Sequence, residues 1–316
     1  MKSITDFSVE GKKVLVRCDF NVPLSESGEI LNDAKIRESL PTLQYLLDHN
    51  AKVIVITHLG DGSESLDGVK KRLFELLGRQ VEVLENIRSH KGEMENSPEF
   101  AKTLADMGDI YINEAFDVCH RNHASVVALP ALLPHGAGFA LQKEVQVLSQ
   151  IMQQPERPMV AIIGGAKVST KAPLVDPFCA FADLVIVNGL IKQELITQEI
   201  PLQYPEKVLG PKDNLESLDI NEQDILRITT PILKAKTIFW NGPFGKFEDE
   251  QYKNGTLQIA KAIIESKAFS VVGGGETIEF LDKEGMLDQF SHVSTGGGAM
   301  LDFLAGQTLP GLDALK

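Results

Sequence analysis

The chain has little cysteine, few aromatic residues and no long apolar run. Its three cysteines, Cys18, Cys119 and Cys179, are odd in number and lie far apart, so they make neither a disulfide framework nor a C-x-x-C metal pair. We expect free thiols in a reducing cytoplasm. No stretch approaches the about 18 apolar residues that cross a bilayer, and the N-terminus lacks the apolar run of a signal peptide. The sequence therefore predicts a soluble cytoplasmic protein that does not enter a membrane.

The chain also has fewer basic than acidic side chains. The chain has 31 basic and 44 acidic side chains, a net charge of −13. This balance weighs against a nucleic-acid-binding protein, because that function needs a basic surface. It leaves room for a local basic pocket that binds a small anion. Hydrophobic content of 43% and charged content of 24% are those of a globular protein, and 316 residues suggest two domains.

Several common catalytic motifs are missing. There is no G-x-x-x-x-G-K-[ST] phosphate loop, and no G-x-G-x-x-G sequence opens a helix. A G-x-S-x-G nucleophile turn and the sequence context of a catalytic cysteine are absent as well. The H-R-N-H sequence at residues 120–123 does not have zinc-ligand spacing. The chain thus offers no candidate covalent nucleophile and no dinucleotide fingerprint.

Short apolar runs alternate with longer amphipathic runs along the whole chain. This alternation is typical of parallel sheets that helices cover on both faces, so we predict an α/β fold. The expected strands are residues 13–18, 52–57, 109–113, 159–163, 184–187, 237–240, 270–272 and 292–294, and the clearest helices of the first half are residues 34–49 and 97–107.

Two prolines mark the boundary between the domains. The helical run 142–153 ends at Gln154-Pro155-Glu156-Arg157-Pro158, and prolines so close together stop a helix. We place a first domain at residues 1–141, a connecting helix and linker at 142–158 and a second domain at 159–300. Residues 301–316 are expected to return to the first domain.

Four expected strands of the second half run directly into glycine-rich loops. Loops after parallel strands gather at one edge of the sheet, and glycine lets backbone N–H groups approach a phosphate. Each loop alone is compatible with a tight turn, but four together favour a phosphate site. Lys167 and Lys171 follow the first loop at i, i+4 spacing, and they either reach this phosphate or are solvated. The loops are Gly164-Gly165, Asn241-Gly242-Pro243-Phe244-Gly245, Gly273-Gly274-Gly275 and Gly296-Gly297-Gly298.

Six of the eight arginines lie within the first 121 residues, which indicates an oxyanion pocket in the first domain. Planar guanidinium groups suit carboxylates and phosphates. Arg37 precedes an apolar helical run, Arg88 and Arg121 lie in polar loops, and His58 follows an expected strand. The chain thus combines an anion-binding half with a nucleotide-type half.

Ten short motifs resemble those of the phosphoglycerate kinase family, and they occur in family order from one end of the chain to the other. Together they are very specific. They are VRCDFNVPL (16–24), IRESLPT (36–42), THLG (57–60), LENIR (84–88), HRNHAS (120–125), GGAKVSTK (164–171), WNGPFGKFE (240–248), GGGET (273–277), STGGGA (294–299) and LPGLDAL (309–315).

The resemblance implies two Rossmann-like domains with parallel sheets, facing each other across a hinged cleft. It also implies a glycolytic transferase that moves a phosphoryl group from 1,3-bisphosphoglycerate to ADP with Mg²⁺, giving 3-phosphoglycerate and ATP. We expect a monomer with these small-molecule substrates and no nucleic-acid partner. Such transfer depends on positioning and charge stabilisation, so the lack of a nucleophile is expected.

The motif positions also imply the residues of the site. Arg37, Lys167 and the helix N-terminus at Gly297 and Gly298 would stabilise the phosphoryl group in flight. Glu248 would hold the ribose, and Glu276 stands where the family places a metal-ligating Asp. The phosphoglycerate side would use Asp19, Asn21, Arg37, His58, Arg88 and Arg121. The nucleotide side would use Gly165, Lys167, Lys171, Asn241, Glu248, Gly274, Gly275, Thr277 and the loop Gly296-Gly297-Gly298.

The chain departs from the family pattern in several places. It is shorter, with one loss between Gly60 and Leu84 and another between about Leu195 and Leu218. Asp61 stands in place of a family arginine, and the family V-N-D-A-F-G reads I-N-E-A-F-D at residues 112–117. Two further hypotheses follow from these changes. One is a weakly active or non-enzymatic relative that binds a phosphorylated metabolite or nucleotide, and the other is a kinase for a different carboxylic acid.

Overall fold

The computed structural model describes all 316 residues, which form two compact units. The first comprises Met1–Val145 and Thr308–Lys316, and the second comprises Gln146–Gln307. The chain passes from one to the other inside helix α5 (Phe139–Gln153), which begins three residues before the expected start at residue 142. Helix α12 (Gly297–Leu304) belongs to the second unit, so the return to the first begins at Thr308 rather than at residue 301.

The first unit is built on a five-stranded parallel sheet with the order β3-β2-β1-β4-β5. The predicted strands of this half are β1, β2 and β4, whose apolar side chains are buried. The short strands β3 and β5 are additional. The bounds are β1 Lys13–Arg17, β2 Lys52–Ile56, β3 Glu82–Val83, β4 Ile110–Asn113 and β5 His135–Ala137.

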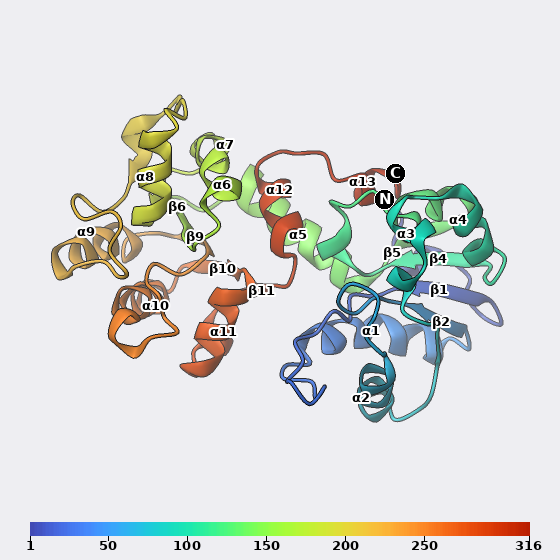
Figure 1. Ribbon diagram of the computed structural model, residues 1–316. Helices are drawn as coiled ribbons and strands as arrows, with labels where there is room; N and C mark the ends of the chain where they lie inside the picture. The colour runs from blue at the N-terminus through green and yellow to red at the C-terminus, as the bar shows by residue number, and fades with distance from the viewer. The chain divides into compact units, whose positions relative to one another are not determined.

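Helices lie on both sides of this sheet, with α1 and α2 on one side and α3 and α4 on the other (Figure 1). Ile36, Leu43 and Leu46 of α1 and Leu73 of α2 pack with the strands into one apolar core. Ser97 caps α4 by accepting a hydrogen bond from the Phe100 N–H. The elements are η1 Ile4–Asp6, α1 Ala34–Asp48, α2 Asp67–Leu77, η2 Ile87–Ser89, α3 Lys91–Met94, α4 Pro98–Ala105, η3 Phe116–Val118, η4 Ala124–Ala128, η5 Pro130–Leu132 and α13 Pro310–Asp313.

The second unit contains a six-stranded parallel sheet with the order β11-β10-β9-β6-β7-β8. All five strands predicted for this half are present. The prediction of an α/β fold with parallel sheets is therefore confirmed in both units. The bounds are β6 Met159–Ile163, β7 Leu184–Val187, β8 Val208–Leu209, β9 Thr237–Asn241, β10 Phe269–Gly273 and β11 His292–Ser294.

Helices also cover both sides of the second sheet, with α6, α7 and α8 on one side and α10 and α11 on the other (Figure 1). Helices α9, α10 and α11 contribute Ile228, Ile259 and Phe280 to one core with the strands. The elements are α6 Val168–Lys171, η6 Ala172–Leu174, α7 Val175–Cys179, α8 Gly189–Thr197, η7 Pro205–Lys207, α9 Glu222–Ile232, η8 Glu250–Tyr252, α10 Asn254–Ser266, α11 Gly275–Lys283, η9 Leu287–Gln289 and α12 Gly297–Leu304.

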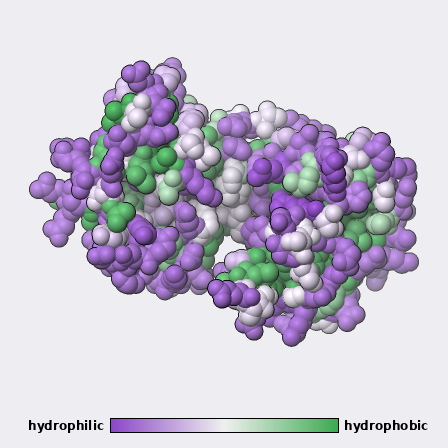
Figure 2. Space-filling model, viewed as in Figure 1, coloured by the Kyte–Doolittle hydropathy of each residue, from purple (hydrophilic) through white to green (hydrophobic).

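The surface is mainly hydrophilic on the face that Figure 2 shows, and apolar side chains appear there in small groups. None of the helices has the length and apolar character needed to span a bilayer. The apolar side chains of the strands are instead used inside the two units.

Glu114 follows β4 and is buried against the start of α5. Its Oε1 accepts a hydrogen bond from the Ala140 N–H at 3.1 Å. Burial raises the pKa of this carboxyl to about 8, although hydrogen bonds from Thr42 and Ala140 oppose the shift. The side chain is therefore neutral in the folded protein at pH 7.

We expect Glu114→Gln to stabilise the protein at pH 8. The unfolded carboxyl ionises near pH 4.5, so the wild type loses stability as pH rises from there toward 8. Glutamine does not ionise, so its contribution does not change over this range. The free energy of unfolding of the variant minus that of the wild type should therefore be about 1–3 kcal/mol larger at pH 8 than at pH 5. Urea unfolding at both pH values measures this. An equal difference at both would mean that Glu114 is already ionised in the fold.

Candidate functional site

Charged side chains of the first unit gather beyond the carboxyl ends of β1, β2 and β4. Arg17 ends β1 and Asp19 follows it, and His58 lies two residues after β2. All three are buried. Because parallel strands end at the same edge of a sheet, residues far apart in sequence meet there, and ligands of α/β proteins bind at this edge.

Arg17 is fully buried at the centre of this group. Its Nε donates to Ser125 Oγ at 2.9 Å, its Nη1 donates to the Cys18 carbonyl at 2.5 Å, and its Nη2 lies 3.1 Å from His58 Nδ1. Ser125 in turn donates through Oγ and N to the two carboxylate oxygens of Glu93, at 2.7 and 2.9 Å. The sequence did not identify Arg17, Ser125 or Glu93 as site residues, because the three lie far apart along the chain.

Asp19 forms an ion pair with Lys35, whose Nζ also lies 3.4 Å from Asp117 Oδ2. Burial opposes ionisation of Asp19, but Lys35 and a hydrogen bond from Asp117 lower its pKa nonetheless. Burial and the Asp19 charge raise the pKa of Asp117 well above its usual range. The two carboxyl groups therefore share one negative charge, which lies on Asp19 and is balanced by Lys35.

Arg37 does not join this group as predicted. Its Nε lies 2.8 Å from Asp33 Oδ1, its side chain is 53% exposed, and Asp33 also binds Arg72. Lys35 and Arg37 are two residues apart on α1, so their side chains point to opposite sides of the helix. Lys35 is the α1 residue that the structure brings to Asp19, and the role of Arg37 in phosphoryl transfer stays a prediction.

Two other predicted residues of this unit, Asn21 and Arg88, meet at the loop around Gly60. Arg88 donates through Nη1 to the Gly60 carbonyl at 2.8 Å, and Asn21 accepts from the Gly60 N–H at 2.9 Å. Burial lowers the pKa of Arg88, and the charges of Arg17 and Arg121 lower it further. The Arg88 Nε is a buried donor without a partner. Three guanidinium groups that repel one another in this way make a site that an anion would stabilise.

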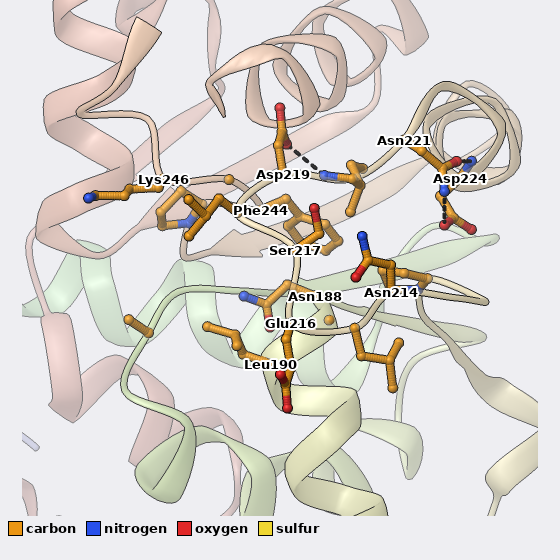
Figure 3. Close-up of a pocket in the computed structure, with 18 of the residues that line it drawn as sticks. Asn188, Leu190, Asn214, Glu216, Ser217, Asp219, Asn221, Asp224, Phe244 and Lys246 are labelled. Carbon is orange, nitrogen blue, oxygen red and sulfur yellow. Dashed lines mark hydrogen bonds between the residues drawn. The ribbon is translucent and has the colours of Figure 1, made fainter. Parts of the chain in front are cut away.

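In the second unit, a cavity of about 350 Å³ opens at the carboxyl ends of β6, β7 and β9. Figure 3 shows Asn188 and Leu190 on one wall, Glu216 and Ser217 from the loop before α9, and Phe244 and Lys246 from the loop after β9. Of the predicted nucleotide residues, Gly165 and Glu248 line this cavity, together with the predicted metal ligand Glu276. The segment 211–221 supplies most of the remaining lining.

The glycines after β6 and β9 allow two loops to pack against each other. The Gly164 and Gly165 N–H groups donate to the carbonyls of Asn241 and Pro243, at 2.8 and 2.7 Å. Gly242 has a φ of +95°, and a Cβ there would lie 2.1 Å from the Gly164 oxygen. These two N–H groups are therefore already used, which corrects the expectation that all four loops present N–H groups to a phosphate.

Two other predicted nucleotide-binding residues, Thr277 and Asn241, are buried and contact these loops. Thr277 is fully buried, and its Oγ1 accepts from the Gly242 N–H at 2.8 Å. Asn241 is 2% exposed and lies against Gly274, where a Cβ would come within 2.9 Å of its Nδ2. Both side chains shape the site and do not line the cavity.

The last two glycine loops begin helices α11 and α12. No heavy atom lies within 4 Å of the position that a Cβ would take on Gly275 or Gly297, so another molecule can approach both backbones closely. The first turns of these helices have N–H groups without helical partners, and the helix dipole adds partial positive charge. The starts of α11 and α12, at Gly275 and Gly297, therefore have open backbone that suits the approach of a phosphate.

Lys167 and Lys171 differ in their surroundings. Lys167 is exposed and precedes α6 as its N-cap, whereas Lys171 is buried and donates through Nζ to the Gly164 carbonyl at 2.6 Å. Burial lowers the pKa of Lys171 to about 8, and the Glu276 charge opposes the shift. A Cβ on Gly165 would lie 2.9 Å from Lys171 Nζ and 3.3 Å from Glu276 Oε2, so both groups meet at that glycine.

A dedicated metal centre is not part of the structure, because no three His, Cys, Asp or Glu side chains converge as ligands. Glu276 is a single exposed carboxylate at the cavity wall. This arrangement fits Mg²⁺, which binds through one or two carboxylates together with water and substrate phosphates.

Comparison with known proteins gives a consistent result. The family model described as phosphoglycerate kinase matches residues 4–84, 69–203 and 197–307. The phosphoglycerate kinase of Aquifex aeolicus is 37% identical to the chain, and the match covers 98% of this chain and 96% of that protein. The phosphoglycerate kinase of Dictyoglomus turgidum is also 37% identical, and the match covers 99% of this chain and 98% of that protein. The structure of phosphoglycerate kinase from Coxiella burnetii is 32% identical, with a TM-score of 0.86 over 99% of this chain and 98% of that one. That from Pyrococcus horikoshii is 28% identical, with a TM-score of 0.88 over 100% and 98%.

The matches also locate the missing segments. The alignment to the Aquifex protein extends over 383 positions although the chain has 316 residues, so it contains gaps. The three matched pieces of the family model join at residues 69–84 and 197–203, within the stretches where the sequence analysis placed the two losses. Both ends of the family pattern are present around these losses, and the chain belongs to the phosphoglycerate kinase family.

Proposed function

We propose that the protein transfers a phosphoryl group reversibly between 1,3-bisphosphoglycerate and ADP, giving 3-phosphoglycerate and ATP. The family makes it a phosphotransferase of the phosphoglycerate kinase type. The observation that carries the proposal is the pair of guanidinium groups of Arg17 and Arg88 beside the neutral ring of His58 at a sheet edge, which remains in a shortened chain of net charge −13. Carboxyl groups of the protein, Glu93 among them, offset part of the repulsion between these guanidinium groups, and an anionic substrate would offset more.

The first unit would bind 3-phosphoglycerate. Arg88 and Arg121 supply positive charge for carboxylate and phosphate oxygens, and neutral His58 supplies a hydrogen-bond donor. Asp19, ionised and held by Lys35, is an acceptor for a substrate hydroxyl. We assign to Lys35 the place that the sequence analysis gave to Arg37, because Lys35 contacts Asp19 and Arg37 is held by Asp33.

The second unit would bind the nucleotide in the cavity beside β6, β7 and β9. Leu190 and Phe244 offer apolar surface for a base, and Glu248 would accept hydrogen bonds from the ribose. Lys167, Lys171 and the starts of α11 and α12 would hold the phosphates. Glu276 would hold Mg²⁺, which when bound supplies charge neutralisation for the phosphates. These groups position the reactants and stabilise charge, and no protein nucleophile is needed.

We also propose that the enzyme acts as a monomer in the cytoplasm. All three cysteines are unpaired and buried, which suits a reducing compartment. The hypothesis of a non-enzymatic or weakly active relative is not favoured, since the matches extend along the whole chain.

A coupled assay with 3-phosphoglycerate and ATP tests the function. Separate titrations with 3-phosphoglycerate and with MgADP show which unit binds which substrate. Arg88→Gln should weaken 3-phosphoglycerate binding at least about tenfold, whereas Arg79→Gln, which removes an exposed ion pair with Asp48, serves as the matched control. Absence of turnover together with binding of neither substrate would overturn the proposal.

We expect Asp61→Arg to change the KM for 3-phosphoglycerate by less than about threefold at 0.15 M salt, because exposed charges are screened there. Asp61 is exposed, and its carboxylate accepts from the Ser63 N–H at 3.0 Å and the Ser63 hydroxyl at 2.8 Å. Steady-state kinetics measures this. A large fall in KM would show instead that the side chain reaches the bound substrate.

A further inference from the structure

A chain of hydrogen bonds with a fixed direction runs from Glu93 to His58 inside the first unit. The Ser125 N–H can only donate, and it donates to Glu93 Oε2 at 2.9 Å. Arg17 can only donate as well, and its Nε points at Ser125 Oγ at 2.9 Å. Ser125 Oγ therefore accepts from Arg17 and gives its own proton to Glu93 Oε1 at 2.7 Å.

The same argument fixes the protonation of His58. Arg17 Nη2 lies 3.1 Å from His58 Nδ1, and since a guanidinium nitrogen has no acceptor capacity, Nδ1 must accept. The single ring proton of neutral His58 then lies on Nε2, which makes no hydrogen bond within the protein. The choice of tautomer in a histidine is set by the partner of its other nitrogen.

The surroundings of the ring oppose a second proton. Burial lowers the pKa of His58 to about 2, and the charges of Arg17, Arg88 and Lys35 act in the same direction. The Asp19 charge acts in the opposite direction and is a weaker influence than burial and the Arg17 charge. The ring is thus neutral across the range in which histidine ordinarily titrates.

We propose that Arg17 is a positioning residue that holds His58 as its Nε2–H tautomer, so that His58 is a constant hydrogen-bond donor to an anionic oxygen of the substrate. This rests on the proposed binding of 3-phosphoglycerate in the first unit. Without the bond to Nδ1, the ring would populate both tautomers. In the tautomer with an unprotonated Nε2, this nitrogen is a hydrogen-bond acceptor and would not bind an anion. Ser125 accepts a hydrogen bond from Arg17 Nε and is itself held by Glu93, so these two residues fix the orientation of the guanidinium group.

Nitrogen NMR of histidine-labelled wild-type protein tests the tautomer directly. His58→Gln identifies the resonances of His58 among the seven histidines. We expect the shifts of a protonated Nε2 and an unprotonated Nδ1, unchanged between about pH 5 and 8. A protonated Nδ1, or titration in this range, would overturn the proposal without any Arg17 variant. Adding 3-phosphoglycerate then tests the proposed function separately, because an unperturbed His58 would refute the substrate site and leave the tautomer result standing.

The variants Arg17→Met and Ser125→Ala then separate positioning from packing. Arg17→Met removes the donor to Nδ1, and we expect mixed tautomers and a KM for 3-phosphoglycerate raised at least about tenfold, with a smaller change in kcat. Ser125→Ala removes one supporting bond and should keep the Nε2–H tautomer. If Arg17→Met does not fold, Arg17→Lys, which retains one donor, should keep the tautomer. Retention of the wild-type tautomer in folded Arg17→Met would contradict the proposal.

Discussion

We expect Lys35→Met to lower kcat/KM for 3-phosphoglycerate by about 10²–10³-fold, whereas Arg37→Met should change it by less than about threefold. Lys35 is the only cation in direct contact with both Asp19 and Asp117. Without it, two buried carboxyl groups lose their counter-charge, which costs about 3–5 kcal/mol. Asp19 would then take up a proton and cease to be an acceptor. Arg37 is in an exposed ion pair, whose contribution is small.

Steady-state kinetics of the two variants side by side measures this contrast. Both variants replace a cation by methionine, at positions two residues apart in α1. Their effects on the stability of the helix are therefore matched. Thermal unfolding of both proteins shows whether the loss of activity exceeds a loss of folded protein. A larger loss for Arg37→Met would return the catalytic role to the residue that the motif suggested.

The sequence was sufficient to predict the sheets because long strands have a clear pattern. The runs at residues 159–163 and 184–187 are continuous apolar segments, and burial on both faces of a parallel sheet favours that composition. Strands β3 and β8 have only two residues each, at the edges of their sheets. Segments so short have no measurable periodicity, and their pairing depends on neighbouring strands.

The site was less predictable because a motif gives position along the chain but not direction in space. Lys35 and Arg37 are both cations in one motif region, and only the packing of α1 decides which one faces Asp19. Arg17 lies in a strand that is otherwise mainly apolar, and the sequence counted it among the clustered arginines without assigning it to the site. Its partner Ser125 is 108 residues away, a distance over which local sequence contains no information.

The glycine loops show a related limit. Glycine permits close approach of a backbone, but the sequence does not reveal whether a ligand or another loop makes the approach. At Gly164 and Gly242 it is another loop, and at Gly275 and Gly297 the space is open. The four loops together predicted the edge of the sheet at which the cavity opens, whereas the contacts that each loop makes depend on tertiary packing.

Lys171 should make the affinity for MgADP fall as the pH rises above about 8. Its pKa is lowered to about 8, chiefly by burial, and only the ammonium form attracts a phosphate. As pH rises above 8, the free protein loses this charge, so the affinity for MgADP should fall by about tenfold per pH unit until the complex itself deprotonates. The terminal phosphate of the nucleotide is fully ionised above about pH 7, so it does not contribute to this change.

Lys171→Met should weaken MgADP binding about 10²-fold at pH 7 and remove the pH dependence, because a charge-assisted bond to phosphate contributes about 1.5–3 kcal/mol. Lys171→Arg is the matched control, since arginine keeps its charge above pH 9. It should therefore bind with an affinity that is lower than that of the wild type at pH 7 but flat from there to pH 9.5. Calorimetric titration of the three proteins at several pH values measures this. A wild-type affinity that is equally flat would mean that the Lys171 ammonium remains with the Gly164 carbonyl and does not reach the nucleotide, in which case Lys167 and the starts of α11 and α12 hold the phosphates without it.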